Sequence, residues 1–228
     1  MNKIAAETAG TFILIFCGCG AIVVNAHYGG HLGHVGICMV FGLTVMAVIY
    51  SVGNISGAHI NPAVTFGFFC AGRIRIREVP MYVASQLIGA LAGAALLKAL
   101  FPQADNLGMT LPAGSVMQSF VLEIVLTFIL MFVVLNVSTG HKEKGIMAGA
   151  AVGGLIVLEA LFGGPVSGAS MNPARSLGPA FMSGNLEHIW IYLTAPMLGA
   201  LLAHPTCKFI QGDQCCFNDK ESTNGSEN

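Results

Sequence analysis

Long apolar stretches separated by short polar segments run along almost the whole chain. A helix needs about 20 mostly apolar residues to cross the hydrocarbon core of a bilayer. Six stretches reach this length, namely residues 4–26, 33–54, 79–101, 117–137, 145–164 and 187–209. The pattern therefore predicts an all-α membrane protein with six transmembrane helices. The first stretch is too long for the apolar region of a signal peptide and lacks a small-residue cleavage site after it, so we expect it to remain as a span.

Composition supports a lipid surrounding. Hydrophobic residues make up 54% of the chain and charged residues 9%, whereas about a quarter of the residues of a soluble domain are charged. The net charge of −1 gives no basic surface for nucleic acid, so the lipid bilayer is an expected partner and nucleic acid is not.

Two segments of the chain resemble each other at a spacing of 111 residues. Residues 56–67, SGAHINPAVTFG, share Ser, Gly, Ala, Asn, Pro, Ala and the final Gly with residues 167–178, SGASMNPARSLG. The repeat extends to LIGAL at 87–91, which matches MLGAL at 197–201. We therefore expect two related halves of the chain with three spans each.

The expected organisation is one membrane domain, residues 1–209, followed by a disordered cytoplasmic tail, residues 210–228. The two repeats cover about 1–110 and 115–209. Because three is an odd number of spans, the second repeat must lie inverted relative to the first if both termini are on one side. Inverted repeats of this kind place a transport site at the membrane midplane between the halves.

Basic residues gather on one side of this topology. Cytoplasmic loops carry an excess of Lys and Arg, so we expect both termini on the cytoplasmic side of the cell membrane. The residues on that side are Lys3, Arg73, Arg75, Arg77, Lys142, Lys144, Lys208 and Lys220. A structural disulfide is not expected there, because the cytoplasm is reducing.

Each copy of the repeated motif precedes a short apolar segment, residues 62–71 and 173–183. Ten residues of helix span about 15 Å, half of a hydrocarbon core. Asn is a favoured N-cap and Pro is favoured at the first helical position. We therefore expect two half-helices that enter the membrane and turn back, opened by the triplets Asn61, Pro62, Ala63 and Asn172, Pro173, Ala174.

These half-helices predict a path for neutral molecules. Two opposed helix N-termini repel a cation at the midplane, and the side-chain amides of Asn61 and Asn172 are expected to be free to donate to a permeant. The extended segments before the half-helices are expected to offer carbonyl oxygens as acceptors. Those residues are Gly57, Ala58, His59 and Ile60 in the first repeat and Gly168, Ala169, Ser170 and Met171 in the second.

The paired Asn-Pro-Ala motifs in inverted three-helix repeats resemble the aquaporin, or major intrinsic protein, family over about residues 4–209. The resemblance implies the aquaporin fold, a homotetramer with one pore per subunit, and passage of water. It also implies an aromatic and arginine constriction, formed here by Phe41, Ala160, Ala169 and Arg175.

The constriction departs from the water-selective pattern, which has His at position 160 and Cys or Thr at position 169. We expect the two alanines to make the constriction wider and more apolar on one side, with Arg175 still supplying donors. The segments around both motifs resemble the nodulin-26-like branch and its bacterial relatives, which implies water with small uncharged solutes such as glycerol, urea, ammonia or metalloid hydroxides. A strictly water-selective channel is the alternative.

Three acidic residues lie in apolar spans. Glu7 and Glu123 occupy equivalent places in the repeats and are expected to accept hydrogen bonds from the entering loops, as the resemblance also implies; a proton relay is the alternative. Glu159 is expected to be an acceptor that holds the second loop, or a residue that tunes Arg175. His27, His31 and His34 crowd one loop, where solvated histidines or a metal site are both open.

No pairing of a nucleophile with a base, phosphate-binding loop or metal-ligand spacing stands out, so we expect neither an enzyme nor a cofactor or bound metal. A coupled secondary transporter also uses inverted repeats, and Glu159 would be its coupling residue. A structural membrane protein that has lost conductance is a further alternative, which the two intact motifs and Arg175 disfavour.

Overall fold

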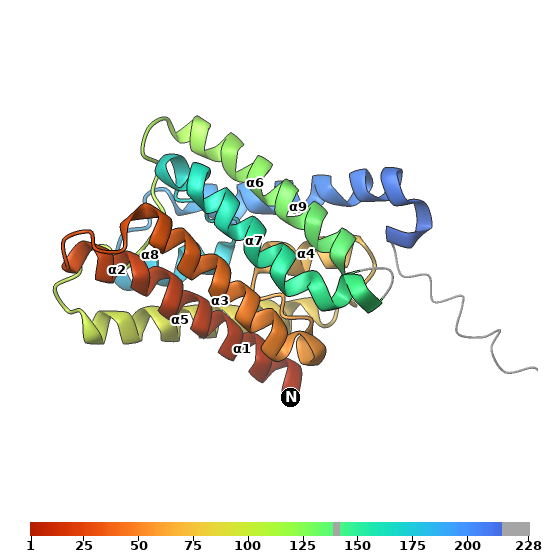
Figure 1. The fold of residues 1–228 in the computed structure, drawn as a ribbon, viewed down its shortest axis with the longest axis horizontal. Coiled ribbons are helices and arrows are strands. Elements are labelled where there is room, and N and C mark those ends of the chain that lie inside the picture. The colour runs from red at the N-terminus through yellow and green to blue at the C-terminus, as the bar shows by residue number, and fades with distance from the viewer. Residues whose placement is uncertain (139–141, 216–228) are drawn as a thin grey trace, which may run out of the picture.

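The chain folds into a bundle of long helices around two short ones (Figure 1). The computed structural model describes residues 1–138 and 142–215, without the side chains of 142–145, 213 and 214. The helices in chain order are α1 (Asn2–Leu14), α2 (Gly20–His27), α3 (Gly33–Ser56), α4 (Pro62–Cys70), α5 (Val79–Leu100), α6 (Val116–Val137), α7 (Lys142–Ser167), α8 (Pro173–Ser183) and α9 (Ile189–Gln211), with a π-helical turn η1 (Ile15–Cys19) between α1 and α2 and a 3-10 turn η2 (Gly212–Cys215) after α9.

The predicted spans correspond to these helices, with ends that differ by a few residues. Within the described residues, five helical segments are long and apolar enough to cross a membrane: Asn2–His27, Gly33–Ser56, Val79–Leu100, Val116–Val137 and Ile146–Ser167. The sixth expected span, α9, is 23 residues long. Its Pro, Thr and His residues lower its hydropathy, so its place in the bundle follows from packing against α6 rather than from composition.

The two halves of the chain pack in the same way. In the first half α1 lies between α3 and α5, and in the second half α6 lies between α7 and α9. The half-helices cross between the halves, because α4 packs against α9 and α8 packs against α5. Figure 1 shows α1, α3, α7 and α6 as neighbouring long helices, with α4 and α8 enclosed behind them. This is the predicted pair of inverted three-helix repeats with two re-entrant half-helices.

Glycines at equivalent places let these helices approach closely. A Cβ atom on Gly89 would lie 2.3 Å from the Thr8 carbonyl oxygen, and one on Gly199 would lie 2.4 Å from the Ile124 carbonyl oxygen. The two glycines are 110 residues apart, the spacing of the LIGAL and MLGAL segments that contain them. Small residues therefore serve contacts inside the bundle, between α1 and α5 and between α6 and α9.

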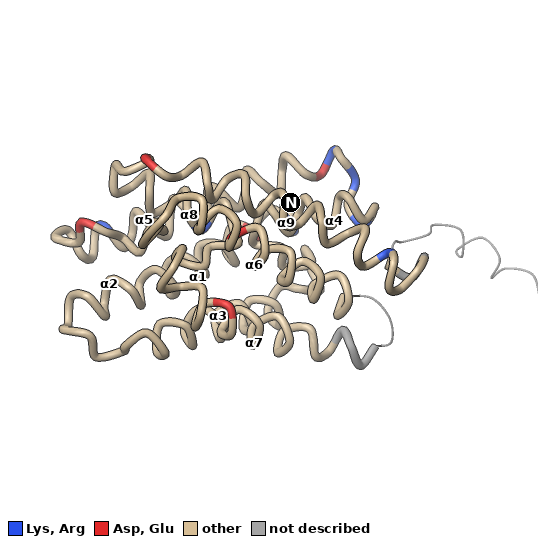
Figure 2. Tube along the Cα trace, turned by 90° about the horizontal axis from the view of Figure 1, so that it is seen from above, with Lys and Arg blue, Asp and Glu red and all other residues tan. Residues whose placement is uncertain are grey.

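Charged residues are placed as a membrane protein requires. Figure 2 shows Lys, Arg, Asp and Glu mostly at the two ends of the bundle, with few along its middle. Lys3 donates to Glu78 across 3.0 Å at one of these ends, and both side chains reach solvent. The few Glu and Arg residues in the middle are Glu7, Glu123, Glu159 and Arg175, all of them buried.

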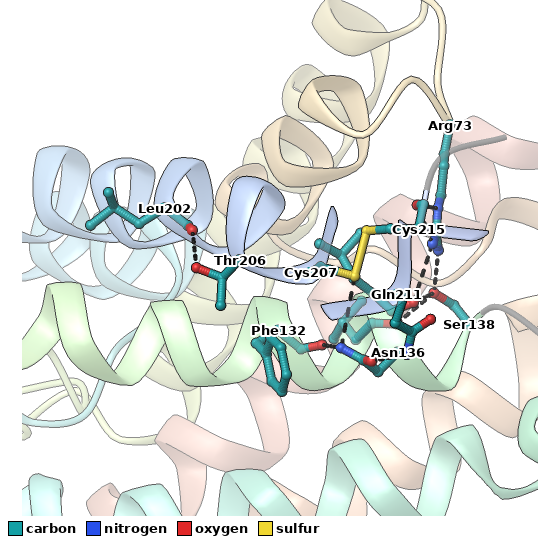
Figure 3. Close-up of a disulfide and its surroundings, with 11 residues drawn as sticks. Arg73, Phe132, Asn136, Ser138, Leu202, Thr206, Cys207, Gln211 and Cys215 are labelled. Carbon is teal, nitrogen blue, oxygen red and sulfur yellow. Dashed lines mark hydrogen bonds between the residues drawn. A yellow bond between two sulfur atoms is a disulfide. The ribbon is translucent and has the colours of Figure 1, made fainter. Parts of the chain in front are cut away.

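The end of α9 is tied to the rest of the bundle. Cys207 and Cys215 form a disulfide, and the Arg73 guanidinium donates to the Cys215 carbonyl oxygen at 2.7 Å and to Ser138 Oγ at 2.7 Å (Figure 3). The expectation of no disulfide at this end is therefore wrong, because η2 folds back and brings the two cysteines together. Helix α9 and η2 also carry regular structure beyond residue 209, whereas residues 216–228 of the expected tail lie outside the described residues.

The glycine contacts give a test of the packing. We expect Gly199→Val to prevent correct packing of α9 on α6, because its side chain would meet the Ile124 carbonyl, and overpacking of this kind costs about 1–3 kcal/mol or more. Thermal stability in detergent, followed by size-exclusion chromatography, measures the loss. Gly154→Val is the matched control, since a Cβ atom there meets nothing within 4 Å. Equal stability of the two variants would contradict the proposed packing.

Candidate functional site

The two Asn-Pro-Ala motifs meet at the centre of the bundle and bind each other. The Asn61 side-chain oxygen caps α4 by accepting from the Ala63 amide at 2.8 Å. Asn172 caps α8 by accepting from the amides of Ala174 at 3.0 Å and Arg175 at 3.2 Å. Each proline stands at the first helical position, where a missing N–H costs nothing. The two half-helices therefore begin face to face.

The sequence predicted that the side-chain amides of these asparagines are free to donate to a permeant. In the structure each amide already makes one hydrogen bond within the protein. Asn61 Nδ2 donates to the Met171 carbonyl at 2.8 Å, and Asn172 Nδ2 donates to the Ile60 carbonyl at 2.9 Å. Each amide thus uses one of its two N–H groups to join the two loops. This reciprocal pair fixes both asparagines at the junction of the repeats.

Two buried carboxylates hold the loops that enter the membrane. Glu7 on α1 accepts from Ser56 Oγ, from the amides of His59 and Ile60, and from Gln86 Nε2, at 2.7 to 2.9 Å. Glu123 on α6 accepts from Ser167 Oγ and from the amides of Ser170 and Met171, at 2.7 to 2.8 Å. Loop amides that point toward α1 and α6 are thereby satisfied without water.

Two tyrosines complete the same arrangement and were missed by sequence reasoning. Tyr82 donates its hydroxyl to the Ser56 carbonyl at 2.7 Å, and Tyr192 donates to the Ser167 carbonyl at 2.7 Å. These carbonyls end the helices that lead into the two loops, where helix termini leave acceptors without partners. The signal was present, since the tyrosines are separated by the same 110 residues as the matched LIGAL and MLGAL segments.

The loops expose their carbonyls through an unusual backbone conformation. Four non-glycine residues have a positive φ: 46° at Ala58, 45° at Ile60, 42° at Ala169 and 53° at Met171. Such angles are strained for residues with a Cβ atom and persist where surrounding contacts determine them. Here the carboxylates on one side of each loop hold the amides, so the carbonyls are left for the other side.

A single cavity of ≈ 440 Å³ passes these carbonyls and reaches both ends of the bundle. Its lining includes the predicted carbonyl segments, Asn61 and Asn172, and the four predicted constriction residues. At one end it is lined by His34, Asn106 and Met109, and at the other by Val137, Ser138 and Ala148. The geometry is that of a path through the protein.

Arg175 and Phe41 form a fixed pair in this cavity. Arg175 is 4% exposed, and its Nη1 donates to the Gly108 carbonyl at 2.7 Å, while its Cζ lies 5.0 Å from the centre of the Phe41 ring. A Cβ atom on Gly18 would lie 2.3 Å from the same ring. The π-helical turn that contains Gly18 therefore makes room for Phe41. Ala160 and Ala169 line the cavity with them.

The segment between α5 and α6 also shapes the site, which the sequence did not indicate. It supplies Gly108 to Arg175, and Thr110 Oγ1 lies 2.7 Å from Ser176 Oγ. Ser176 in turn contacts Ser170 Oγ. The signal was weak because a loop without charge or a repeated motif gives no reason to place it in the core.

Glu159 does not hold the second loop. Its side chain is fully buried, and neither carboxylate oxygen has a hydrogen-bond partner among the described residues. The expectation that it accepts from this loop is wrong, because Glu123 already takes the amides of Ser170 and Met171. Glu159 lies close enough to Glu123 for an electrostatic interaction. A negative charge on Glu159 would be buried beside Glu123 without a hydrogen-bond partner. This burial is costly and favours an uncharged Glu159.

His59 lies in the loop before α4, two residues before Asn61. Its Nδ1 is 3.1 Å from Thr65 Oγ1, and its ring stacks on Phe68 at 4.6 Å between centroids. The side chain is 9% exposed and lines the cavity. Of the other loop histidines, His34 also reaches the cavity, whereas His27 packs against Tyr28 and Phe101.

Comparison with known proteins agrees with this geometry. The model of the family described as major intrinsic protein matches residues 1–205. The chain belongs to the major intrinsic protein family. It is similar to aquaporin NIP1-3 of Oryza sativa subsp. japonica, at 50% identity over 201 residues, which cover 88% of this chain and 70% of that protein. Nodulin-26 of Glycine max is 46% identical over 202 residues, covering 88% and 74%.

Solved structures agree as well. The X-ray structure of the aquaglyceroporin from Plasmodium falciparum superposes with a TM-score of 0.81 at 28% identity, covering 91% of this chain and 94% of that chain. This major intrinsic protein is therefore a multi-pass membrane channel for water and small neutral solutes, with the aquaporin fold, and it is not an enzyme. Its relatives place it with the nodulin-26-like branch.

Substitutions of Glu123 and Glu159 give a paired test of the site. We expect Glu123→Gln to abolish conduction or folding, because an amide has one acceptor oxygen and would turn its NH₂ toward donors. Each buried amide left without a partner costs about 1–3 kcal/mol. Glu159→Gln replaces one uncharged group by another and should keep water permeability within about twofold. Osmotic shrinkage of proteoliposomes measures both, and a severe loss in Glu159→Gln would contradict the uncharged assignment.

Proposed function

We propose that the neutral solutes conducted with water include molecules of the size of urea and glycerol, and that Arg175 with the half-helix N-termini excludes ions and protons. The observation that carries this proposal is that Ala160 and Ala169 line the same cavity as the fixed pair of Phe41 and Arg175. Ammonia and metalloid hydroxides are smaller or similar uncharged molecules and belong to the same solute range.

The arrangement of donors and acceptors suits a molecule that carries hydroxyl or amide groups. In the constriction the Arg175 guanidinium provides donors, while Phe41 and the two alanines give an apolar wall. Beyond it, carbonyls of Gly168 and Ala169 accept. A solute with a polar edge and an apolar edge can therefore exchange its hydration for protein contacts as it passes.

An ion finds no protein contacts among the described residues of this path that replace its lost hydration. Arg175 is permanently charged and buried, so a cation meets repulsion in a medium of low dielectric constant. At the midplane the N-termini of α4 and α8 add a positive potential equivalent to roughly half a charge each. A proton carried along a water file meets the same potential. The amides of Asn61 and Asn172, fixed by their cross-contacts, also orient the water molecule that they bind.

The small side chains at positions 160 and 169 support solutes larger than water. In the water-selective pattern an imidazole would stand at position 160 and a Cys or Thr side chain at position 169. Alanine at both places leaves only a methyl group on that side of the path. The name aquaglyceroporin of the superposed Plasmodium falciparum structure is in line with this solute range.

The surroundings of the channel are part of the same proposal. We place both termini in the cytoplasm, because Lys3, Arg73 and Lys208 lie at one end of the bundle, where the positive-inside tendency puts them. The family resemblance implies a homotetramer with a pore in each subunit. Large apolar side chains on the outside, such as Leu43, Ile88 and Leu202, are available to lipid or to neighbouring subunits.

The constriction is tested by restoring a large side chain. We expect Ala160→His to lower glycerol and urea flux by about tenfold or more while water flux falls less, since pore selectivity follows diameter and the polar groups of the lining. Stopped-flow light scattering of proteoliposomes under osmotic and solute gradients measures the three fluxes. Ala160→Gly, which cannot narrow the path, is the control. Water flux without detectable solute flux in the unmodified protein would show a strictly water-selective channel instead.

A further inference from the structure

A Cys and a His lie side by side in the cavity, one helical turn above the constriction. His34 and Cys38 are four residues apart on α3, a spacing that puts both side chains on one face of a helix. Both line the cavity, and Phe41 follows on the same helix. Cys38 Sγ lies 3.8 Å from His34 Nδ1 and 3.6 Å from Nε2.

The proline in α7 decides how this histidine is oriented. Pro165 lies inside α7 and has no N–H, so the carbonyl of Leu161, four residues earlier, loses its helical partner. His34 Nε2 lies 2.7 Å from that carbonyl oxygen. A carbonyl can only accept, so Nε2 carries the proton and Nδ1 carries a lone pair. A metal-binding histidine is oriented in the same way, by donating its other ring N–H to a backbone carbonyl.

We propose that His34 Nδ1 and Cys38 Sγ form a site for a borderline or soft metal ion, such as Zn²⁺, in the mouth of the pore. A tetrahedral ion with bonds of about 2.3 Å to sulfur and about 2.0–2.1 Å to nitrogen holds the two ligand atoms about 3.6 Å apart. In the structure Sγ lies 3.8 Å from Nδ1 and 3.6 Å from Nε2, so it stands between the two nitrogens and is not aligned with the Nδ1 lone pair. Rotation of the cysteine side chain between staggered positions can turn Sγ toward the Nδ1 lone pair.

Water supplies the remaining ligands. Among the described residues no three His, Cys, Asp or Glu side chains converge on one point, so the protein gives two ligands here. On binding, the ion exchanges two water ligands for Sγ and Nδ1, and the thiol proton passes to solvent. Such a site binds reversibly. Hard ions such as Mg²⁺ prefer oxygen ligands and six-fold geometry, so they are not expected to bind.

An ion held there would block conduction. Arg175 and Phe41 form the constriction one helical turn farther along the path. The ion cannot pass this fixed cation, so it stays in the mouth. Its charge and its water shell occupy the space through which solutes enter. The site thus makes the channel sensitive to metal ions that arrive from one side only. That side carries the segment between α5 and α6, whose residues Asn106 and Met109 line the same mouth.

The test compares cysteines inside and outside the cavity. We expect micromolar Zn²⁺ to slow osmotic shrinkage of proteoliposomes by about threefold or more, as an ion in a single-file path should, with Mg²⁺ inert and EDTA restoring flux. Cys38→Ser should remove the effect, and Cys17→Ser should keep it, since Cys17 lies in an outer groove beside α5. Equal inhibition of Cys38→Ser and the unmodified protein would overturn the proposal.

A second variant and a second readout separate ligand loss from misfolding and from loss of conduction. His34→Gln keeps an N–H donor for the Leu161 carbonyl and removes the ring nitrogen, and we expect it to raise the Zn²⁺ concentration for half-inhibition by about tenfold or more. Co²⁺ added to the purified protein should give a thiolate-to-metal absorption band that Cys38→Ser lacks. This band does not depend on flux, so its absence rejects the site whichever solutes the channel conducts.

Discussion

The structure depends on satisfying irregular backbone in the middle of a membrane. No water is available there to bind loop amides, and each buried group without a partner costs free energy. Glu7 and Glu123 solve this problem by taking two amides each from the loops before α4 and α8. The carboxylates hold one edge of each loop. The other edge is left with its carbonyls, which we propose to line the pore, so the structural solution and the proposed transport path have the same origin.

The two repeats share this scaffold but differ where they face the solute. Gln86 donates to Glu7, whereas Pro196 stands at the equivalent place in the second repeat and donates nothing. The second repeat instead brings Glu159 near Glu123, without a direct hydrogen bond. At the half-helices Val64 and Arg175 are equivalent. The shared positions build the fold, and the positions that differ give the pore two unlike ends.

The sequence predicted the parts of the fold that rest on local chemistry. Apolar length gave the spans, and the repeated Asn-Pro-Ala motif gave the half-helices and their caps, because capping involves neighbouring residues. It did not predict contacts between distant segments, such as Gly108 with Arg175 or the cross-contacts of Asn61 and Asn172 with the opposite loops. Those contacts depend on how the two halves of the chain pack together. Glu159 was assigned wrongly for the same reason, because Glu123 from another helix accepts the loop amides.

One proline links the shape of the bundle to the chemistry of its mouth. Pro165 lies inside α7 near its end at Ser167 and removes one hydrogen bond from this helix. The carbonyl of Leu161 thereby loses its partner within the helix and accepts a hydrogen bond from His34 on α3. This hydrogen bond joins the two helices. That contact fixes the ring of His34 beside Cys38. A proline in one helix therefore orients a side chain on another helix, at one end of the cavity.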